Sequence, residues 1–113
     1  MAKHDLNLDL IFHALSDPTR RAMLARLASG PIAVSDLARP TGMALPTIMR
    51  HLSVLEQAEL ITSEKSGRTR MCRAQPQTLG ATMDWLSHQR AQWEARTDRL
   101  EAYVATLIAK DQP

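Results

Sequence analysis

The side chains best suited to binding chemistry are concentrated in the stretch L-P-T-I-M-R-H-L-S, which runs from residue 45 to residue 53. The stretch supplies hydroxyl, guanidinium and imidazole groups, and all three can form hydrogen bonds with the edges of nucleic-acid bases. These groups belong to Thr47, Arg50, His51 and Ser53. Because arginine can donate two parallel hydrogen bonds to guanine, Arg50 is the strongest candidate for reading a base.

The spacing of the apolar residues predicts that this stretch is helical. Apolar side chains recur at intervals of three and four residues, which would align them on one buried stripe and leave the polar groups elsewhere. They are Leu45, Ile48, Leu52 and Leu55. Pro46 suits the first turn of a helix, where its missing N–H is not needed. The helix would therefore present a polar and cationic surface.

A second short helix is predicted immediately before this one. Ser35 is placed to cap it, and Gly42 suits the positive φ that ends a helix and turns the chain. Two short helices joined by a tight turn, over residues about 35–58, are typical of a helix-turn-helix DNA reader. An ordinary helical hairpin with a solvated outer face is the alternative interpretation.

The segment that follows, residues about 61–74, predicts a β-hairpin that turns at Ser66-Gly67. Its candidate DNA-contacting residues are Lys65, Arg68, Thr69 and Arg70, and Arg73 lies further along. A basic hairpin directly after a reading helix is a wing, and its cations suit phosphates or a minor groove. A charged hairpin tip alone would also serve solubility, so the prediction depends on the order of the elements.

The C-terminal region, residues about 77–109, predicts a long helix with a seven-residue apolar repeat. The repeat consists of Leu79, Leu86, Trp93, Leu100 and Leu107. Met83, Thr97 and Val104 occupy the complementary positions, and Arg90 interrupts them. A stripe of this kind can pack on the protein's own core, but a small winged unit offers too little surface for it. A partner helix from a second copy is the better account.

Two further helices are predicted near the N-terminus. Residues about 6–15 form an amphipathic helix whose apolar face we expect to join the dimer interface. Asp17-Pro18 starts a second helix, which ends before Gly30-Pro31. Ile32 to Val34 is expected to be an extended link, and Gly80 to break or fray the last helix. The predicted dimer interface comprises Leu8, Ile11, Phe12, Leu86, Trp93, Leu100, Val104 and Leu107.

The length, charge and composition of the chain limit the classes of protein to which it can belong. The chain has 113 residues, which suits one domain with one modest core, and its formal charge of +2 does not by itself indicate nucleic-acid binding. We expect a mainly α fold with a small β-hairpin wing, an α+β winged helix-turn-helix. No secretory leader and no apolar run of about 20 residues is found, so we expect a cytosolic protein without a membrane span.

No catalytic or metal site is predicted. With four glycines in total, the chain has no phosphate-cradling loop, and no nucleophile with a paired base stands out, so we expect no enzyme and no cofactor. Asp84 and His88 are one helical turn apart, but two ligands are too few for zinc, and His4 and His13 could add to them only by coincidence. Cys72 is the only cysteine, so a redox role would have no resolving thiol.

The order of these motifs resembles the ArsR family of bacterial winged-helix repressors. The resemblance lies in I-F-H-A-L-S-D-P-T-R-R-A-M-L-A-R-L from residue 11 to 27, in L-P-T-I-M-R-H-L-S-V-L-E, and in S-G-R-T-R of the wing. The segment from Trp85 to Tyr103 is similar to the non-metal branch called SdpR-like or autorepressor-type. The resemblance implies a homodimer, built from first and last helices, that binds an inverted-repeat operator and blocks transcription of its own or a neighbouring operon.

One departure from the family pattern concerns the start of the reading helix. The family usually carries serine where Ala44 stands, and alanine cannot cap a helix through its side chain, which typically costs about 1 kcal/mol. Leu45 and Met49 could contact thymine methyl groups instead of polar base edges. Arg20 and Arg21 also match a family signature, and we interpret them as structural ion-pair partners.

The main rival hypothesis is a winged-helix protein-interaction module without specific DNA binding. The basic wing beside a polar reading helix argues against it, because a protein-contact surface has no need of Arg68, Thr69 and Arg70 in that place. Neither a small-molecule effector nor the operator sequence can be inferred from these residues.

Overall fold

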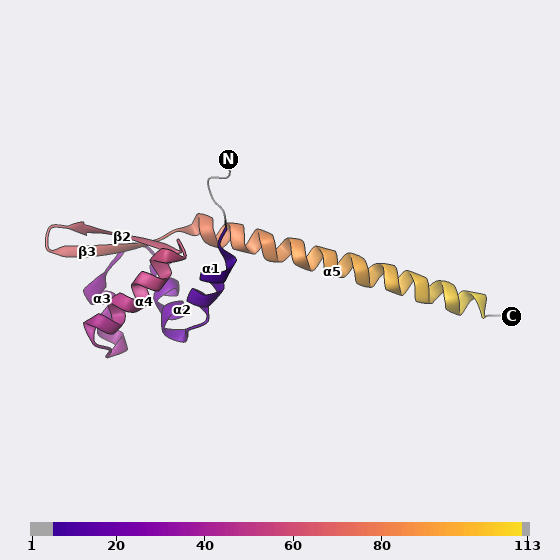
Figure 1. Cartoon of the computed structure of the whole chain (residues 1–113), viewed down its shortest axis with the longest axis horizontal. Coiled ribbons are helices and arrows are strands. Elements are labelled where there is room, and N and C mark those ends of the chain that lie inside the picture. Colours follow the sequence, from indigo (N-terminus) through magenta and orange to yellow (C-terminus); the bar gives the residue numbers. More distant parts are fainter. Residues whose placement is uncertain (1–5, 112–113) are drawn as a thin grey trace. The chain divides into compact units, whose positions relative to one another are not determined.

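The computed structural model describes residues 6–111, and its element order follows the sequence expectation closely (Figure 1). The helices and strands are α1 Leu8–Leu15, α2 Pro18–Leu27, β1 Ile32–Ala33, α3 Val34–Ala38, the 3-10 helix η1 Arg39–Thr41, α4 Leu45–Gln57, β2 Ile61–Ser66, β3 Thr69–Ala74 and α5 Pro76–Lys110. Internal contacts divide the chain into two compact units, residues 1–80 and residues 81–113.

Side-chain caps determine where the first two helices begin. The Asn7 side chain accepts a hydrogen bond of 3.1 Å from the N–H of Leu10, so α1 starts at Leu8 rather than at the predicted residue 6. Asp17 caps α2 as predicted, accepting from the N–H of Arg20 at 3.0 Å, with Pro18 in the first turn. This hydrogen bond lowers the pKa of the Asp17 carboxyl, because it favours the charged form.

The helix-turn-helix consists of α3, η1 and α4. α3 begins at Val34, and its N-cap residue, Ala33, makes no side-chain hydrogen bond. The expectation that Ser35 caps this helix was wrong, because the helix starts before Ser35 and includes it. Gly42 adopts a φ of 68°, the left-handed conformation predicted for the turn. Ala44 makes no side-chain cap hydrogen bond, and α4 starts directly after it.

The wing is part of a three-stranded antiparallel sheet in the order β1-β3-β2. β2 and β3 form the predicted hairpin, in which Ser66 faces Thr69 across the turn at Gly67, whose φ is 65°. The segment predicted as an extended link is a strand, β1, in which Ile32 pairs with Cys72 and Ala33 with Met71. Sequence reasoning missed this pairing because it joins residues that are about forty positions apart.

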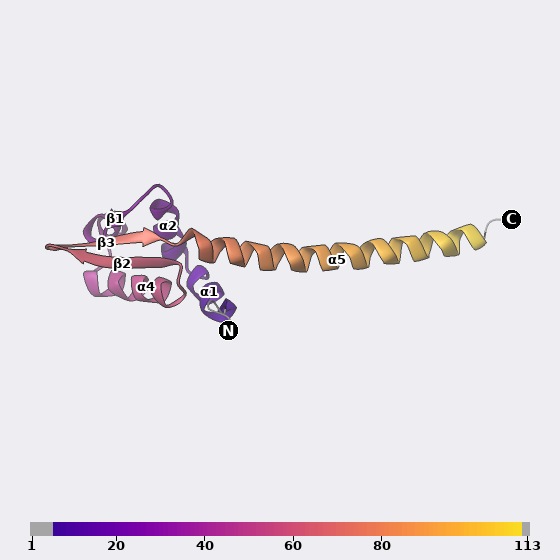
Figure 2. The ribbon, with the colours of Figure 1, turned by 90° about the horizontal axis from the view of Figure 1, so that it is seen from above.

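The core lies between the helices and the inner face of the sheet, and the predicted stripe of α4 supplies part of it. Ile48, Leu52 and Leu55 are each no more than 2% exposed. Leu45, in contrast, is 56% exposed, so its predicted burial was wrong: at the first position of α4 it projects beyond the core. Figure 2 shows α4 alongside β2, with which it is in contact.

α5 is continuous from Pro76 to Lys110, so the break expected at Gly80 does not occur. Leu79, within the first unit, packs against the core. Of the described residues after Gly80, only Thr82 is buried. From Leu86 onward, the apolar repeat along α5 is therefore exposed in the single chain.

A backbone feature fixes the passage from α4 into β2. Glu59 is the only described residue other than glycine with a positive φ, which is 60°. The N–H of Leu60 donates to the carbonyl of Leu55 at 3.0 Å, and the N–H of Glu59 to that of Glu56 at 2.9 Å. This pair of hydrogen bonds is a Schellman motif, in which glycine usually occupies the left-handed position.

We expect Glu59→Gly to raise the free energy of unfolding by about 1 kcal/mol, because glycine adopts the left-handed conformation without strain. The greater entropy of glycine in the unfolded chain offsets only part of this gain. Urea unfolding at a fixed protein concentration would measure the change. Gln57→Gly, at the exposed last residue of α4, is the matched control and should lower stability by less than about 1 kcal/mol. A loss of stability in both variants would contradict the strain at Glu59.

Candidate nucleic-acid interface

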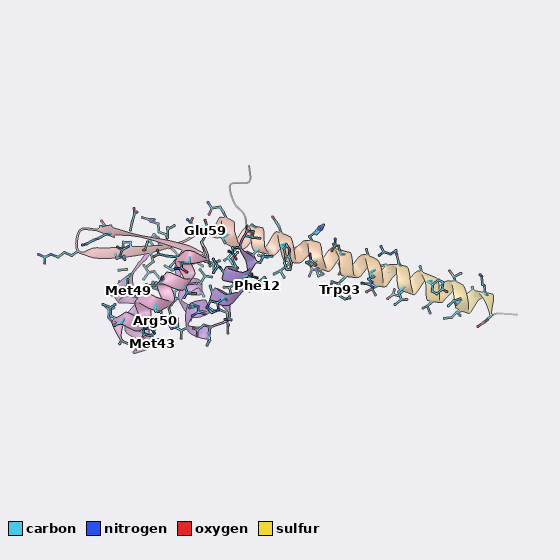
Figure 3. The ribbon with its side chains drawn as sticks, viewed as in Figure 1. Phe12, Met43, Met49, Arg50, Glu59 and Trp93 are labelled. Carbon is cyan, nitrogen blue, oxygen red and sulfur yellow. The ribbon has the colours of Figure 1, made fainter. Side chains whose placement is uncertain are left out.

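The predicted reading residues lie on the exposed side of α4. Leu45, Met49 and Ser53 follow one another at intervals of four residues, and Pro46 and Arg50 form the adjacent row. All five are exposed, whereas Thr47 is partly buried. Figure 3 labels Met49 and Arg50 on α4 and Met43 in the turn before it. The outer surface of α4 therefore combines apolar side chains with one cation.

The cationic side chains of the first unit differ in whether they have a hydrogen-bond or ion-pair partner within the protein. In the described residues up to Gly80, hydrogen bonds or ion pairs engage the side chains of Arg20, Arg21, Arg26, Arg39, Arg70 and Arg73. Over the same range, no hydrogen bond or ion pair is made by the side chains of Arg50, Lys65 and Arg68. These three exposed cations lie on α4 and on the wing, where an anionic ligand could reach them.

The register of the wing gathers positive charge at its end. Lys65 and Arg70 are directly opposite each other in the β2–β3 ladder, and Arg68 follows Gly67 in the turn. Like charges at facing positions repel each other, so a bound phosphate would relieve this pair. Arg73 lies elsewhere, since its guanidinium approaches the Glu64 carboxylate at 3.8 Å.

A hydrogen-bonded chain connects α4 to the wing. The Ser63 hydroxyl donates to Oε1 of Glu56 at 2.5 Å and accepts from Nη1 of Arg70 at 3.0 Å. The hollow between α4 and the wing is lined by Met49, Leu52, Ser53, Glu56, Ser63 and Arg70. Sequence reasoning missed Glu56 and Ser63, because no local pattern signals a contact between a helix end and the next strand. This chain of contacts holds Arg70 beside the reading face.

His51 has a different environment from the rest of the predicted set. Its Nδ1 atom is 3.2 Å from Nη1 of Arg20 and 4.0 Å from a carboxylate oxygen of Asp17. Because arginine can only donate, Nδ1 of His51 is the acceptor in this hydrogen bond. The Nδ1 side of the ring is therefore engaged between α2 and α4, and DNA contact by His51 stays a prediction.

Arg20 is the centre of that junction. It is buried, and its guanidinium donates to the carbonyls of Ala14 at 2.8 Å and His13 at 2.9 Å, at the end of α1. Arg21 donates to the carbonyl of Leu15 at 2.8 Å. Both arginines are structural, as expected, but their main partners are backbone carbonyls rather than the carboxylates of ion pairs.

Proteins of known class are similar to this chain in sequence. Residues 15–64 match a family described as a helix-turn-helix domain. The chain is 41% identical over 73 residues to the HTH-type transcriptional regulator Rv2034 of Mycobacterium tuberculosis, covering 65% of this chain and 68% of that protein. It is 33% identical over 76 residues to the transcriptional repressor SdpR of Bacillus subtilis, covering 67% of this chain and 84% of that protein.

Solved structures of transcriptional regulators are also similar to this chain. The crystal structure of the ArsR family transcriptional regulator RHA00566 matches with a TM-score of 0.74 and 47% identity, covering 77% of this chain and 96% of that chain. The chain belongs to the ArsR family. A possible ArsR-family regulator from Mycobacterium bovis, solved as a homodimeric winged helix-turn-helix domain, matches with a TM-score of 0.58 and 26% identity, covering 81% of this chain and 94% of that chain.

Membership of the ArsR family confirms the winged helix-turn-helix fold and makes the protein a DNA-binding transcriptional regulator rather than an enzyme. The relative SdpR also agrees with the branch that the C-terminal segment resembles. None of the helices among residues 6–111 is long and apolar enough to cross a membrane.

Within the described part of this ArsR-family chain, Cys72 and the acidic and histidine side chains form no evident chemical site. Burial raises the pKa of the Cys72 thiol, Glu56 adds to the rise, and Arg70 opposes it, so the unreactive thiol is favoured. Between residues 6 and 111, no three His, Cys, Asp or Glu side chains lie close enough to hold a metal ion. His4 lies outside the described residues.

We expect Arg20→Met to lower the free energy of unfolding by about 2–4 kcal/mol, because methionine fills similar space but removes the donor that the carbonyl of Ala14 and the ring of His51 receive from Arg20. Thermal or urea unfolding would measure this loss. Arg21→Met removes one exposed hydrogen bond and should cost less than about 1 kcal/mol. Equal losses in the two variants would show that Arg20 does not anchor the junction.

Proposed function

We propose that this protein is a homodimeric repressor that occupies an inverted-repeat DNA site and blocks transcription of its own or a neighbouring operon in the cytoplasm. The observation that supports the proposal best is the position of Arg50, Lys65 and Arg68. These are the cations of the described first unit that lack protein partners, and all three lie on the two elements that an ArsR-family regulator directs at DNA. The names of the relatives, among them a repressor, support the direction of regulation.

In the proposed complex α4 enters the major groove. Arg50 donates two hydrogen bonds to a guanine, and the hydroxyls of Thr47 and Ser53 contact bases or nearby phosphates. Leu45, Pro46 and Met49 form the apolar part of the same surface. His51 is not included, because its Nδ1 atom is already hydrogen-bonded to Arg20.

The wing contacts the backbone in this proposal. Lys65 and Arg68 neutralise phosphates, and Thr69 can donate its hydroxyl hydrogen to a phosphate oxygen. Arg70 stands opposite Lys65 and is steadied by Ser63, so it would approach the DNA from a defined direction. Such contacts position the protein and add affinity without reading sequence.

The exposed apolar repeat of α5 supports dimerisation with a second copy. Trp93 is 66% exposed and Leu100 is 61% exposed, and the repeat continues along a helix that has almost no buried residue of its own after Gly80. A seven-residue repeat is the pattern of helices that pack along each other. The proposed seam on α5 comprises Leu86, Trp93, Leu100, Val104 and Leu107.

α1 is the second proposed dimer element, with one revision. Leu8 is partly buried and Phe12 is 40% exposed, so both can contribute to an interface. Ile11 is only 1% exposed because it packs into the core of the first unit, which contradicts its expected role in the interface. In a two-fold dimer the reading helices would enter successive major grooves about 34 Å apart, which accounts for an inverted repeat.

Arg50 and Arg68 should differ in what their loss does to DNA binding. Arg50→Ala should relax base preference and cost about 1–3 kcal/mol at the preferred site only, because a bidentate contact to guanine is lost. Arg68→Ala should weaken all duplexes alike and reduce the slope of log affinity against log salt by about one. Titrations of a selected site and of a scrambled duplex at several salt concentrations measure both.

Arg99→Ala is the control for those titrations, since it removes one exposed charge from α5 instead of from the reading elements. It should change neither base preference nor the salt slope. An equal loss from Arg50→Ala on selected and scrambled DNA would refute its assignment to a base. Salt-independent binding of the unaltered protein would favour a protein-interaction module instead.

The dimer is tested by a charge placed in the seam. Leu100→Asp should yield monomers and abolish binding to the inverted repeat, because two buried carboxylates would face each other without partners. Sedimentation velocity measures the oligomeric state. Ala102→Asp adds the same charge on the side of α5 opposite the proposed seam and should leave the dimer intact. A Leu100→Asp protein that still sediments as a dimer would show that the seam lies elsewhere.

A further inference from the structure

The start of α4 is unusually poor in polar side chains for a surface that faces DNA. Leu45 is 56% exposed, Met49 is 40% exposed, and Met43, in the preceding turn, is 38% exposed. Pro46 lies between them in the sequence and is exposed as well. The side chain of Ala44 forms no cap hydrogen bond, so it too presents only a methyl group.

None of these five side chains carries an N–H or O–H donor or an oxygen acceptor. They therefore cannot distinguish base pairs by hydrogen bonds. In the major groove the single apolar group on a base edge is the C5 methyl of thymine. An apolar surface that reaches the groove can thus discriminate thymine from the other bases only through that methyl group.

The surroundings of this apolar surface favour DNA over a protein as its occupant. Met49 also lines the hollow that the wing closes with Arg70, so the apolar row leads directly to the basic hairpin. Arg50 occupies the next position along α4 and has an unpaired guanidinium. A surface flanked by cations on both sides is suited to an anionic partner, and the side chains between those cations would meet the base edges rather than the phosphates.

We infer that Leu45 and Met49, supported by Met43, determine specificity by packing against thymine methyl groups in each half of the operator. This inference rests on the proposed function, because it assumes that α4 lies in the major groove. It goes beyond that function in naming the chemical group that is read. Arg50 then provides the polar contact to guanine, and the apolar row provides a second, independent selection for thymine.

Uracil substitution tests the inference, since uracil differs from thymine by the C5 methyl alone. The full chain is first used to select a site from random-sequence duplexes, and each thymine of the selected site is then replaced by uracil. At one or more thymines per half-site, affinity should fall about fourfold for each methyl removed, and about sixteenfold when both half-sites are changed.

A variant with both Leu45→Ala and Met49→Ala identifies the side chains responsible. Both residues are exposed and alanine favours helix, so the fold should persist, which circular dichroism checks. In this variant the ratio of affinities for thymine and uracil duplexes should fall to about one. Ile108→Ala, which removes an exposed apolar side chain from α5, is the control and should keep the ratio of the unaltered protein.

The outcomes separate this inference from the proposed function. If no sequence is enriched in the selection, the proposed function fails. If a site is enriched but uracil binds as well as thymine at every position, the methyl inference alone is overturned. It is also overturned if the ratio survives in the double variant, because other residues would then read the methyl group. A double variant that keeps full operator affinity would assign the apolar surface to a protein partner.

Discussion

The position of α4 relative to α1 and α2 depends on the hydrogen bonds of one buried guanidinium. Arg20 reaches from α2 to the last carbonyls of α1 and to the ring of His51 on α4, so three helices are tied at one point. Burying an arginine is unfavourable unless its donors are satisfied, and here each recorded partner is an acceptor. The same contacts give the carbonyl of Ala14, near the end of α1, a side-chain donor, whereas that of His13 also accepts from Ser16. The junction therefore fixes the direction of α4 while keeping its opposite face free for a ligand.

The cations of the first unit fall into two groups, those with partners in the protein and those without. Arg20, Arg21 and Arg26 donate to backbone carbonyls within the first unit, so these N–H groups are not free to bind a ligand. Arg50 and Arg68 have no such partners and remain available to an anion. A formal charge of only +2 is compatible with DNA binding for this reason, because the local arrangement of cations matters more than their total.

The parts of the fold that sequence could predict are those with local causes. Asp17 followed by Pro18 starts α2, and Gly42 and Gly67 turn the chain, because each of these residues acts on its immediate neighbours. The pairing of β1 with β3 and the inward turn of His51 could not be predicted, since their partners are distant in the sequence. The helical period placed Leu45 on the buried stripe, but it cannot tell where the core ends along the helix axis.

The exposed start of α4 shows how stability and recognition are distributed along one helix. Its first turn lacks a side-chain cap at Ala44, which typically costs about 1 kcal/mol. Ile48, Leu52 and Leu55 are fully buried further along, and burial of such side chains contributes roughly 1.5–3 kcal/mol each. The helix is thus held by its later turns, and its first turn need not contribute polar groups to its own stability. Apolar residues such as Leu45 can therefore occupy the first turn without loss of the helix. Which side chains stand there then depends on the ligand that this surface contacts and not on the stability of α4.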